Sequence, residues 1–178
     1  MKSMERPDPK SVGHSKTTMT QLVMPNDTNH LGNLMGGNLM KWMDIVCAMC
    51  ASRHAQSPVV TASVDNISFK SPIRLGEICI LNAFVTKAFN TSLEVFVEVY
   101  AENAITGEKR RANDAYFTFV SMDITTQRPN KVAQVIPESD KEQKFFEGAS
   151  RRRELRLILS GRLKPSQATL LKDFFDRK

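Results

Sequence analysis

A short apolar segment in the first third of the chain most restricts the folds that this sequence can adopt. From Leu39 to Ala51 nearly every residue is apolar, whichever face of a helix it falls on, and only Lys41 and Asp44 interrupt the run. Such a pattern is typical of a helix that protein surrounds, because a helix on a surface keeps one polar face. The run is too short to cross a bilayer, so we expect a buried helix in a globular core and no integral membrane segment.

A polar, glycine-rich segment, residues 29–37, leads directly into this helix. Gly36 and Gly37 fit a helix start just before Asn38, where the first backbone N–H groups lack intrahelical partners. With the helix dipole behind them, these groups can hold an oxyanion or a polarised carbonyl.

Asp44 does not fit a simple apolar core, because it lies about two turns into the helix between Met43 and Ile45. A carboxylate in apolar surroundings is costly unless it is paired or hydrogen-bonded, and such groups often have a chemical role. The alternative is an ion pair with Lys41, three residues earlier on the helix surface. The helix by itself leaves both interpretations open.

The composition is that of one globular domain. The chain has 178 residues, of which 41% are hydrophobic and 25% charged, so wholesale disorder is excluded. Residues 1–10 contain charges and prolines but no apolar stretch of a secretory signal. Three cysteines, an odd number, argue against a disulfide framework and agree with a reducing compartment. We therefore expect a cytoplasmic protein.

Cys47 and Cys50 form a C-x-x-C motif, which is also found at redox and zinc sites. Here the motif lies inside an apolar helix, and the sequence has no second pair of ligands. Buried thiols are the better interpretation, and no metal site is expected.

The net charge of +6 suits nucleic acid, an anionic membrane surface or a small molecule that carries phosphate. The basic runs Lys109–Arg111 and Arg151–Arg153 have no interleaved aromatic residues of a nucleic-acid motif. A polyphosphate ligand, or simply a solvated surface, explains the charge at least as well.

The remaining pattern predicts an α+β fold. Strands are expected over residues 17–23, 59–69, 78–88, 92–101 and 112–122, and charged helices over residues 138–159 and 166–175. In the fourth strand Leu93, Val95, Val97 and Val99 alternate with Glu94, Phe96, Glu98 and Tyr100. We expect a mobile arm over residues 1–15, a main domain over 16–123, and a linker with a helical extension over 124–178. One curved sheet of about five strands cannot cover an apolar helix on all sides, so a homodimer is also expected.

Several segments, taken together, resemble the hotdog-fold acyl-CoA thioesterases, in particular the branch of YciA-type and cytosolic eukaryotic acyl-CoA hydrolases. The resemblance covers about residues 15–123, and Arg151–Arg153 also looks like the tail of that branch. Its motifs are Met24–Gly37, Met43-Asp44, Val60–Asp65, Phe69–Ile73, Leu75–Glu77 and Thr91–Val95. Their order and spacing are specific to the family, although each fragment is weak alone.

The resemblance implies a sheet wrapped around the helix, two subunits joined through their sheets, and active sites at the dimer interface. It implies Asn29 and Asp44 as a catalytic pair contributed by opposite subunits, with the N–H groups of Gly36 or Gly37 on the thioester carbonyl. The implied reaction is hydrolysis of acyl-CoA to a fatty acid and coenzyme A, by water that Asp44 activates or by direct attack of Asp44. No cofactor is called for, because coenzyme A is part of the substrate. A trimer of dimers, a hexamer, follows from the resemblance alone.

Four basic positions near strand ends are candidates for the phosphates of coenzyme A: Lys70, Arg74, Arg110 and Arg111. Ordinary surface charge is the alternative for each. Some relatives carry a regulatory arginine in the turn before Thr91, whereas this chain has Phe89-Asn90, so the sequence gives no support for nucleotide regulation. His30 follows Asn29, but a lone loop histidine is more often structural.

Two other functions compete with hydrolysis. The first is a hotdog module that binds acyl-CoA as a sensor without hydrolysing it. No recognisable helix-turn-helix precedes residue 15, which counts against a sensor that acts as a repressor. The second is a nucleic-acid binder, which rests on net charge alone. The presence of both Asn29 and Asp44 favours the enzyme.

Overall fold

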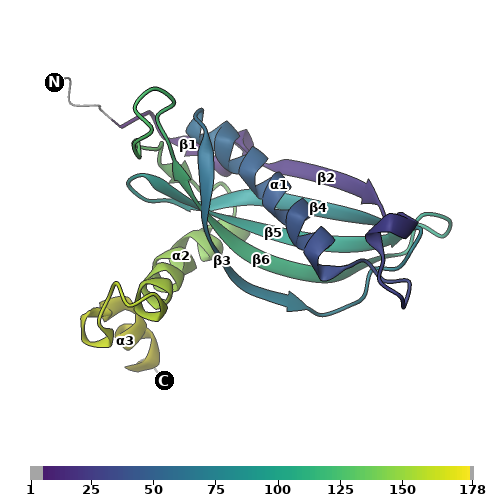
Figure 1. Cartoon of the computed structure of the whole chain (residues 1–178). Coiled ribbons are helices and arrows are strands. Elements are labelled where there is room, and N and C mark those ends of the chain that lie inside the picture. Colours follow the sequence, from purple (N-terminus) through teal and green to yellow (C-terminus); the bar gives the residue numbers. More distant parts are fainter. Residues whose placement is uncertain (1–5, 177–178) are drawn as a thin grey trace. The chain divides into compact units, whose positions relative to one another are not determined.

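The computed structural model of the chain describes residues 6–176. The chain folds into two compact units, and the boundary between them lies between Ile136 and Pro137. In the described residues, the first unit holds a five-stranded sheet, a two-stranded sheet and one long helix, and the second holds two helices (Figure 1). Within residues 6–176, no helix has the length and apolar character that crossing a membrane requires.

A five-stranded antiparallel sheet forms the body of the first unit. The strands lie in the order β2 (Thr17–Leu22), β4 (Glu77–Ala88), β5 (Ser92–Asn103), β6 (Lys109–Ser121) and β3 (Val59–Phe69). Short connections join β4, β5 and β6, as their antiparallel pairing allows. The five strands predicted from the sequence are confirmed, and β2 and β3 are the two edges of the sheet.

The helix α1 (Gly36–Ala55) lies across one face of this sheet (Figure 1). Eight of its residues are buried: Leu39, Trp42, Met43, Val46, Cys47, Cys50, Ala51 and His54. With the buried side chains of β4, β5 and β6 they make up the core. The α+β class and the hotdog arrangement, one helix wrapped by an antiparallel sheet, are therefore confirmed.

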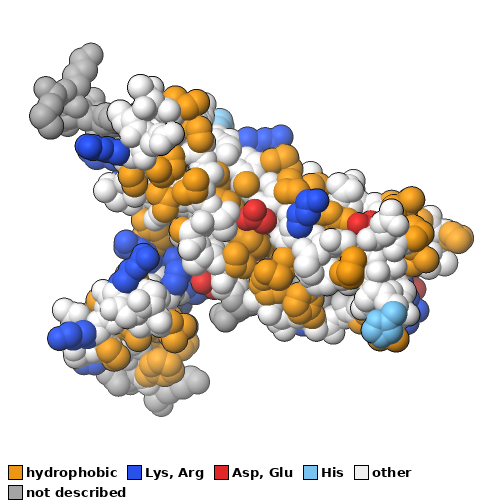
Figure 2. All heavy atoms as spheres, in the orientation of Figure 1, with side chains coloured by type: hydrophobic (Ala, Val, Ile, Leu, Met, Phe, Trp, Pro, Cys, Tyr) orange, Lys and Arg blue, Asp and Glu red, His pale blue; other side chains and the backbone are white. Residues whose placement is uncertain are grey.

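One side of α1 is left partly exposed by the described residues of the first unit. Met40, Ile45 and Met49 keep 37–41% of their surface exposed. On the edge strand β3, Val60 and Val64 are 51% and 38% exposed. Figure 2 shows this face, with hydrophobic side chains gathered over α1 and β3. The sheet of a single chain thus leaves part of an apolar helix open, as the sequence predicted.

The N-terminal segment differs from the expected mobile arm from Lys10 onward. Strand β1 (Lys10–Ser11) pairs in parallel with β7 (Val135–Ile136), and the adjacent Val12 is buried. Residues 1–5 of the expected arm lie outside the described residues. Burial of one valine and a strand partner far along the chain hold this segment, and neither is visible in a short polar sequence.

The segment after β6 also differs from the expected linker. Val132, Ala133 and Val135 are buried, and the N–H of Val132 donates to the carbonyl of Asn90 at 3.1 Å. These contacts keep residues 124–136 with the first unit, so the compact units divide later than residue 123.

The second unit consists of α2 (Asp140–Leu159) and α3 (Thr169–Asp176), close to the two predicted helices. Helix α2 begins after Ser139, whose side chain accepts a hydrogen bond from the N–H of Glu142. The N–H of Leu171 donates to Glu154 at 3.0 Å, and the Arg151 guanidinium lies 5.0 Å from the centre of the Phe174 ring. The two helices therefore contact each other. Residues 177–178 of the expected extension lie outside the described part of the chain.

Candidate active site

Asn29 is held in a tight loop ahead of α1. Its backbone N–H donates to the carbonyl of Asn33 at 2.8 Å, and its side-chain oxygen accepts from the N–H groups of Leu31 and Asn33 at 3.0 and 3.2 Å. Gly32 has a φ of +72°, which a glycine adopts without steric cost. Because the loop occupies the amide oxygen, the Nδ2 group of this exposed side chain stays available as a donor: within residues 6–176 it has no partner.

The start of α1 leaves backbone donors free of any side-chain cap. The residue before the helix is Met35, whose side chain has no oxygen to accept a hydrogen bond, and no side chain caps the helix start. The first backbone bond inside the helix runs from the N–H of Leu39 to the carbonyl of Met35. The N–H groups of Gly36 and Gly37 therefore keep their donor capacity at the positive end of the helix dipole.

Asn29 and Gly36 line the same cavity, which has a volume of about 390 Å³. Phe69 lies against Gly36: a Cβ added there would approach the ring to 3.1 Å, so glycine is what lets the ring contact the helix start. Gly37 is not part of the lining. The other lining residues are Asn33, Leu34, Leu39, Phe69, Ser71, Pro72, Ile73 and Asn113. An amide donor and an uncapped helix start thus converge on a mostly apolar hollow.

Asp44 is half-buried and lies two turns further along α1, outside that cavity. Its carboxylate accepts a hydrogen bond from the Thr61 hydroxyl of β3 at 2.8 Å. In the described residues no ion pair joins it to Lys41. The structure thus favours a hydrogen-bonded carboxylate over the surface ion pair. One chain brings Asn29 and Gly36 together but not Asp44.

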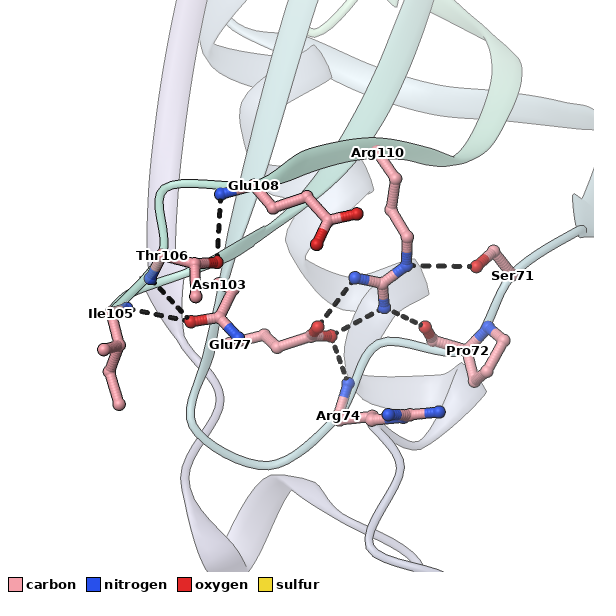
Figure 3. A network of polar contacts seen from close by, with 9 residues as sticks. All are labelled: Ser71, Pro72, Arg74, Glu77, Asn103, Ile105, Thr106, Glu108 and Arg110. Carbon is pink, nitrogen blue, oxygen red and sulfur yellow. Dashed lines mark hydrogen bonds and ion pairs between the residues drawn. The ribbon is translucent and has the colours of Figure 1, made fainter.

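The four basic candidates for phosphate binding differ in their partners. Arg110 makes two short hydrogen bonds to Glu77, at 2.6 and 2.7 Å, and also contacts Pro72 and Ser71 (Figure 3). Lys70 and Arg111 both contact the same oxygen of Asp114, at 2.8 and 2.9 Å. The exposed guanidinium of Arg74 makes no hydrogen bond and no ion pair with any residue from 6 to 176.

A second cavity of about 350 Å³ lies beside the first on the loop between β3 and β4. Arg74, Arg110, Glu77 and Glu108 contribute to its walls, and Ser71 and Pro72 line both cavities. The hydrogen bonds from Arg110 hold the pKa of the Glu77 carboxyl below its ordinary value, so the pair is charged at neutral pH. This part of the chain is therefore polar and charged, in contrast to the cavity at Asn29.

The C-x-x-C cysteines are free, buried thiols. Cys47 and Cys50 lie in the core of α1, and burial raises the pKa of Cys50 to about 12. Across residues 6–176, no three His, Cys, Asp or Glu side chains are grouped as ligands for a metal ion. Neither thiol has the character of a nucleophile or a ligand.

The chain is similar to known thioesterases over most of its length. The thioesterase superfamily model matches residues 31–108. The uncharacterised acyl-CoA thioester hydrolase YkhA of Bacillus subtilis is 37% identical, over 78% of this chain and 80% of its own. The cytosolic acyl coenzyme A thioester hydrolase of Mus musculus is 35% identical, but the matched part covers 89% of this chain and 42% of that longer protein. The chain therefore belongs to the thioesterase superfamily.

Solved structures give the same answer. An apo-hexameric acyl-CoA thioesterase superposes with a TM-score of 0.83 at 38% identity, covering 86% of this chain and 98% of that one. The acyl-CoA hydrolase of Staphylococcus aureus, solved with butyryl coenzyme A and coenzyme A, has a TM-score of 0.79 at 37% identity and covers 85% and 94%. Structures of that hydrolase with an Asp, a Thr or an Asn replaced by alanine are equally similar. The resemblance to hotdog acyl-CoA thioesterases is confirmed.

Sequence reasoning missed two contributors to this site. Thr61 lies within a segment that carried the resemblance, but nothing in the sequence showed that its hydroxyl meets Asp44, since the two come from different elements. The pairing of Arg110 with Glu77 was also missed, because these residues are brought together only when β4, β5 and β6 align. The only sequence signal for Thr61 was its type and place: a β-branched residue with a hydroxyl, near the start of a predicted strand.

Proposed function

We propose that this protein is an acyl-CoA thioesterase, which hydrolyses the thioester of acyl-CoA to a free fatty acid and coenzyme A. The observation that carries the proposal is the cavity on which the Asn29 amide and the uncapped start of α1 converge. The relatives named as acyl-CoA thioester hydrolases, and the similar hydrolase solved with butyryl coenzyme A, support this substrate class. The enzyme is thus a hydrolase.

In the proposed reaction the thioester carbonyl lies at the helix start. The N–H groups of Gly36 and Gly37 donate to its oxygen, where negative charge develops as the carbonyl carbon becomes tetrahedral. The Asn29 Nδ2 group is a donor and cannot take a proton, so it orients the thioester or the attacking water. These donors are in place before the reaction, which lowers the reorganisation that the transition state needs.

Asp44 supplies the base or the nucleophile. As a base it takes a proton from water while the water oxygen attacks the carbonyl carbon, and the C–S bond then breaks to release the coenzyme A thiolate. As a nucleophile it attacks the carbon directly, the C–S bond breaks to release the coenzyme A thiolate, and water then hydrolyses the anhydride that remains. The Thr61 hydroxyl, 2.8 Å from one carboxylate oxygen, fixes the orientation of the group in either route. The similar hydrolase was studied with an Asp, a Thr and an Asn replaced, and Asp44, Thr61 and Asn29 are residues of those three types.

We propose further that Asp44 completes the site of a second subunit. Asp44 lies outside the cavity that Asn29 lines in its own chain, and the exposed side of α1 beside β3 is the surface that a partner would cover. The edge strand β3 offers the sheet continuation that a homodimer needs. A trimer of such dimers accords with the hexameric thioesterase that the chain resembles.

Of the basic candidates Lys70, Arg74, Arg110 and Arg111, we propose Arg74 as the residue best suited to contact the phosphates of coenzyme A. Its guanidinium is exposed, whereas Arg110 is held by Glu77 and the other two share Asp114. Coenzyme A enters as part of the substrate, so we propose that the reaction needs no separate cofactor. A cytoplasmic location is proposed from the free thiols and the cytosolic hydrolase among the relatives.

The sensor remains the second candidate function. A binding module would have the same hollow for acyl-CoA without turnover. Donors aimed at a carbonyl, and a hydrogen-bonded carboxylate on the same helix, are needed for chemistry rather than for retention of the ligand, and they favour the hydrolase.

A thiol-release assay across acyl-CoA chain lengths tests the proposal. We expect the wild type to hydrolyse at least one acyl-CoA, and Asp44→Ala and Asn29→Ala to lose about 10²-fold or more of kcat while remaining folded and oligomeric. Lys41→Ala, an exposed position one turn from Asp44, is the matched control and should retain activity. The buried cysteines keep the background reaction with a thiol reagent low.

Equal activity in all variants would remove the assignment of Asn29 and Asp44. A wild type that binds acyl-CoA but releases no thiol at any chain length would establish the sensor instead. Affinity for nucleic acid that falls steeply with rising salt would support the third hypothesis, a nucleic-acid binder.

A further inference from the structure

A short loop, residues 70–77, connects the charged network of Figure 3 to the cavity at Asn29. On one side Arg110 donates to the carbonyl of Pro72 at 2.7 Å and to the Ser71 hydroxyl at 3.4 Å. The Glu77 carboxylate, which Arg110 holds through two bonds, accepts from the N–H of Arg74 at 2.7 Å. The Arg110–Glu77 pair therefore holds this loop at three of its residues: Ser71, Pro72 and Arg74.

On its other side the same loop holds the segment that carries Asn29. The N–H of Leu34 donates to the carbonyl of Ile73 at 2.7 Å, and the N–H of Leu75 donates to the carbonyl of Gly32 at 2.9 Å. Asn33 and Arg74 form a β-bridge between the two segments. The position of Asn33 is thus set by its contact with the loop.

Asn33 in turn orients the Asn29 side chain. Its N–H donates to the Asn29 Oδ1 atom at 3.2 Å, and its carbonyl accepts from the Asn29 N–H at 2.8 Å. Arg110 is therefore connected to the Asn29 amide by hydrogen bonds to residues 71–72, by the backbone bonds between residues 73–75 and 32–34, and by the bonds from Asn33. A catalytic amide needs such support, because small displacements of a donor cost turnover.

We propose that Arg110 and Glu77 are positioning residues for the Asn29 amide and the adjoining cavity wall, rather than contacts of coenzyme A. The inference rests on the proposed thioesterase function and assigns a different role to Arg110 from that of a phosphate ligand. The bidentate geometry supports it: a guanidinium with Glu77 on one edge and a backbone carbonyl on the other has little donor capacity left for a phosphate.

The loop has other attachments, so disrupting the pair should shift it without unfolding the sheet. The N–H of Lys70 donates to the Asn113 side chain at 3.0 Å, and the N–H of Gly76 donates to the carbonyl of Val23 at 3.0 Å. Both remain when Arg110 is changed. The pair is also partly exposed, with 36% of the Arg110 side chain and 13% of the Glu77 side chain accessible.

Two conservative variants separate positioning from ligand contact. Arg110→Lys keeps the charge but cannot bridge Glu77 and Pro72 with a planar fork, and Glu77→Gln keeps the shape but weakens the bidentate pair. Positioning predicts that both lower kcat, by about 10- to 100-fold for Arg110→Lys, with little change in KM. Direct phosphate contact predicts a raised KM at constant kcat for Arg110→Lys, and a lowered KM for Glu77→Gln because Arg110 is released.

A double-mutant comparison then tests whether the effect passes through Asn29. If the pair acts by orienting this amide, Arg110→Lys should cost almost nothing more in an Asn29→Ala background, whereas independent effects on kcat multiply. Lys109→Gln, next to Arg110 on β6 and over the Tyr100 ring, removes a charge from the same strand and should leave kcat and KM unchanged. Circular dichroism and size-exclusion chromatography check that each variant keeps its fold and assembly.

The inference would be overturned if the losses of kcat from Arg110→Lys and Asn29→Ala multiply. It would also be overturned if Arg110→Lys raises KM at constant kcat, as a phosphate contact predicts. Either result would leave the proposed thioesterase function standing. If Asn29→Ala has no measurable turnover, or Arg110→Lys does not fold, the response of Glu77→Gln decides alone. A wild type without any hydrolysis would instead defeat the proposed function.

Discussion

The two ends of α1 are built on opposite principles. At the N-terminal end Met35 offers no cap, two glycines follow it, and a cavity adjoins the first turn. At the C-terminal end Gln56 adopts the left-handed conformation, with a φ of 51°, and its N–H donates to the carbonyl of Ser52 at 2.7 Å. The first end leaves backbone donors free, whereas at the second end the carbonyls of Ser52 and His54 both accept hydrogen bonds, the latter from the Lys10 ammonium at 2.8 Å.

The last turn of the helix is also tied to its surroundings by side chains. His54 is fully buried, with one ring nitrogen 3.1 Å from the carbonyl of Ala133 and the other 3.4 Å from the Ser15 hydroxyl. Arg53 donates to the Thr17 hydroxyl at 3.1 Å, and as a cation near the helix C-terminus it complements the dipole. In the proposed reaction the N-terminal end gives up capping contacts and keeps its donors for the substrate, whereas the C-terminal end, which has no proposed role in the chemistry, makes stabilising contacts.

The largest expected effect comes from capping the N-terminal end of α1. Met35 has extended backbone angles, with a φ of −63° and a ψ of 136°, so a serine there can accept from the N–H of Gly37 or Asn38. We expect Met35→Ser to raise the free energy of unfolding by about 1 kcal/mol and to lower kcat by about tenfold or more, because the cap competes for donors of the thioester carbonyl. Chemical denaturation and steady-state kinetics measure both.

Met35→Leu keeps the end uncapped and is the matched control, with kcat expected to stay near that of the wild type. A stabilised Met35→Ser variant with full turnover would show that the free N–H groups have no part in catalysis.

The next effect is the pH dependence of stability that His54 causes at the C-terminal end of α1. Burial holds the pKa of His54 below its ordinary value of 6.5, so the folded protein keeps this imidazole neutral. As the pH falls below 6.5, the unfolded chain takes up a proton at His54 that the folded chain does not. Stability should therefore fall as the pH falls from 6.5 towards the lowered pKa, by up to about 1.4 kcal/mol per pH unit.

Unfolding measured between pH 7 and 5, at one fixed protein concentration, checks this expectation. His54→Gln should flatten the dependence, whereas His30→Gln, at an exposed loop position, should leave it as in the wild type. An unchanged slope in His54→Gln would mean that the buried histidine does not control this range.

The smallest effect is a relief of backbone strain at Gln56, at the C-terminal end of α1. A left-handed conformation costs a side-chain-bearing residue about 1–2 kcal/mol, whereas glycine adopts it freely. Gln56→Gly should therefore raise the free energy of unfolding by about 0.5–1 kcal/mol with no change in kcat. Ala55→Gly, one residue earlier and within the helix, should have the opposite sign by a similar amount. Equal signs for the two would show that the cap geometry is not strained.

Some of this architecture was readable from local patterns. The apolar run predicted α1, because a helix needs apolar residues on every side that is covered, and the glycines predicted its start. The alternation of Leu93, Val95, Val97 and Val99 predicted β5. The other face of β5 carries Glu94, Phe96, Glu98 and Tyr100, yet Glu94 and Phe96 are only 0% and 2% exposed. A period-two pattern identifies a strand but does not show what packs on its second face.

Other parts depended on pairings between distant segments. The pairing of β1 with β7 joins residues more than a hundred positions apart, and neither two-residue strand has a recognisable pattern of its own. Candidate residues Asn29 and Asp44 came from resemblance, since composition and spacing alone left Asp44 open to an ion pair with Lys41. Their roles, and the subunit from which Asp44 acts, stay predictions.

The sequence by itself determined the order of the five main strands, the central helix and the family, because hydrophobic periodicity and short motifs are properties of neighbouring residues. Tertiary structure alone decided that Thr61 meets Asp44, that Arg110 is held by Glu77, and that Asn29 shares a cavity with Gly36. The reason is physical: such contacts need strands in register and loops in contact, and no local preference of the chain encodes the distance between two segments that only the folded sheet brings together.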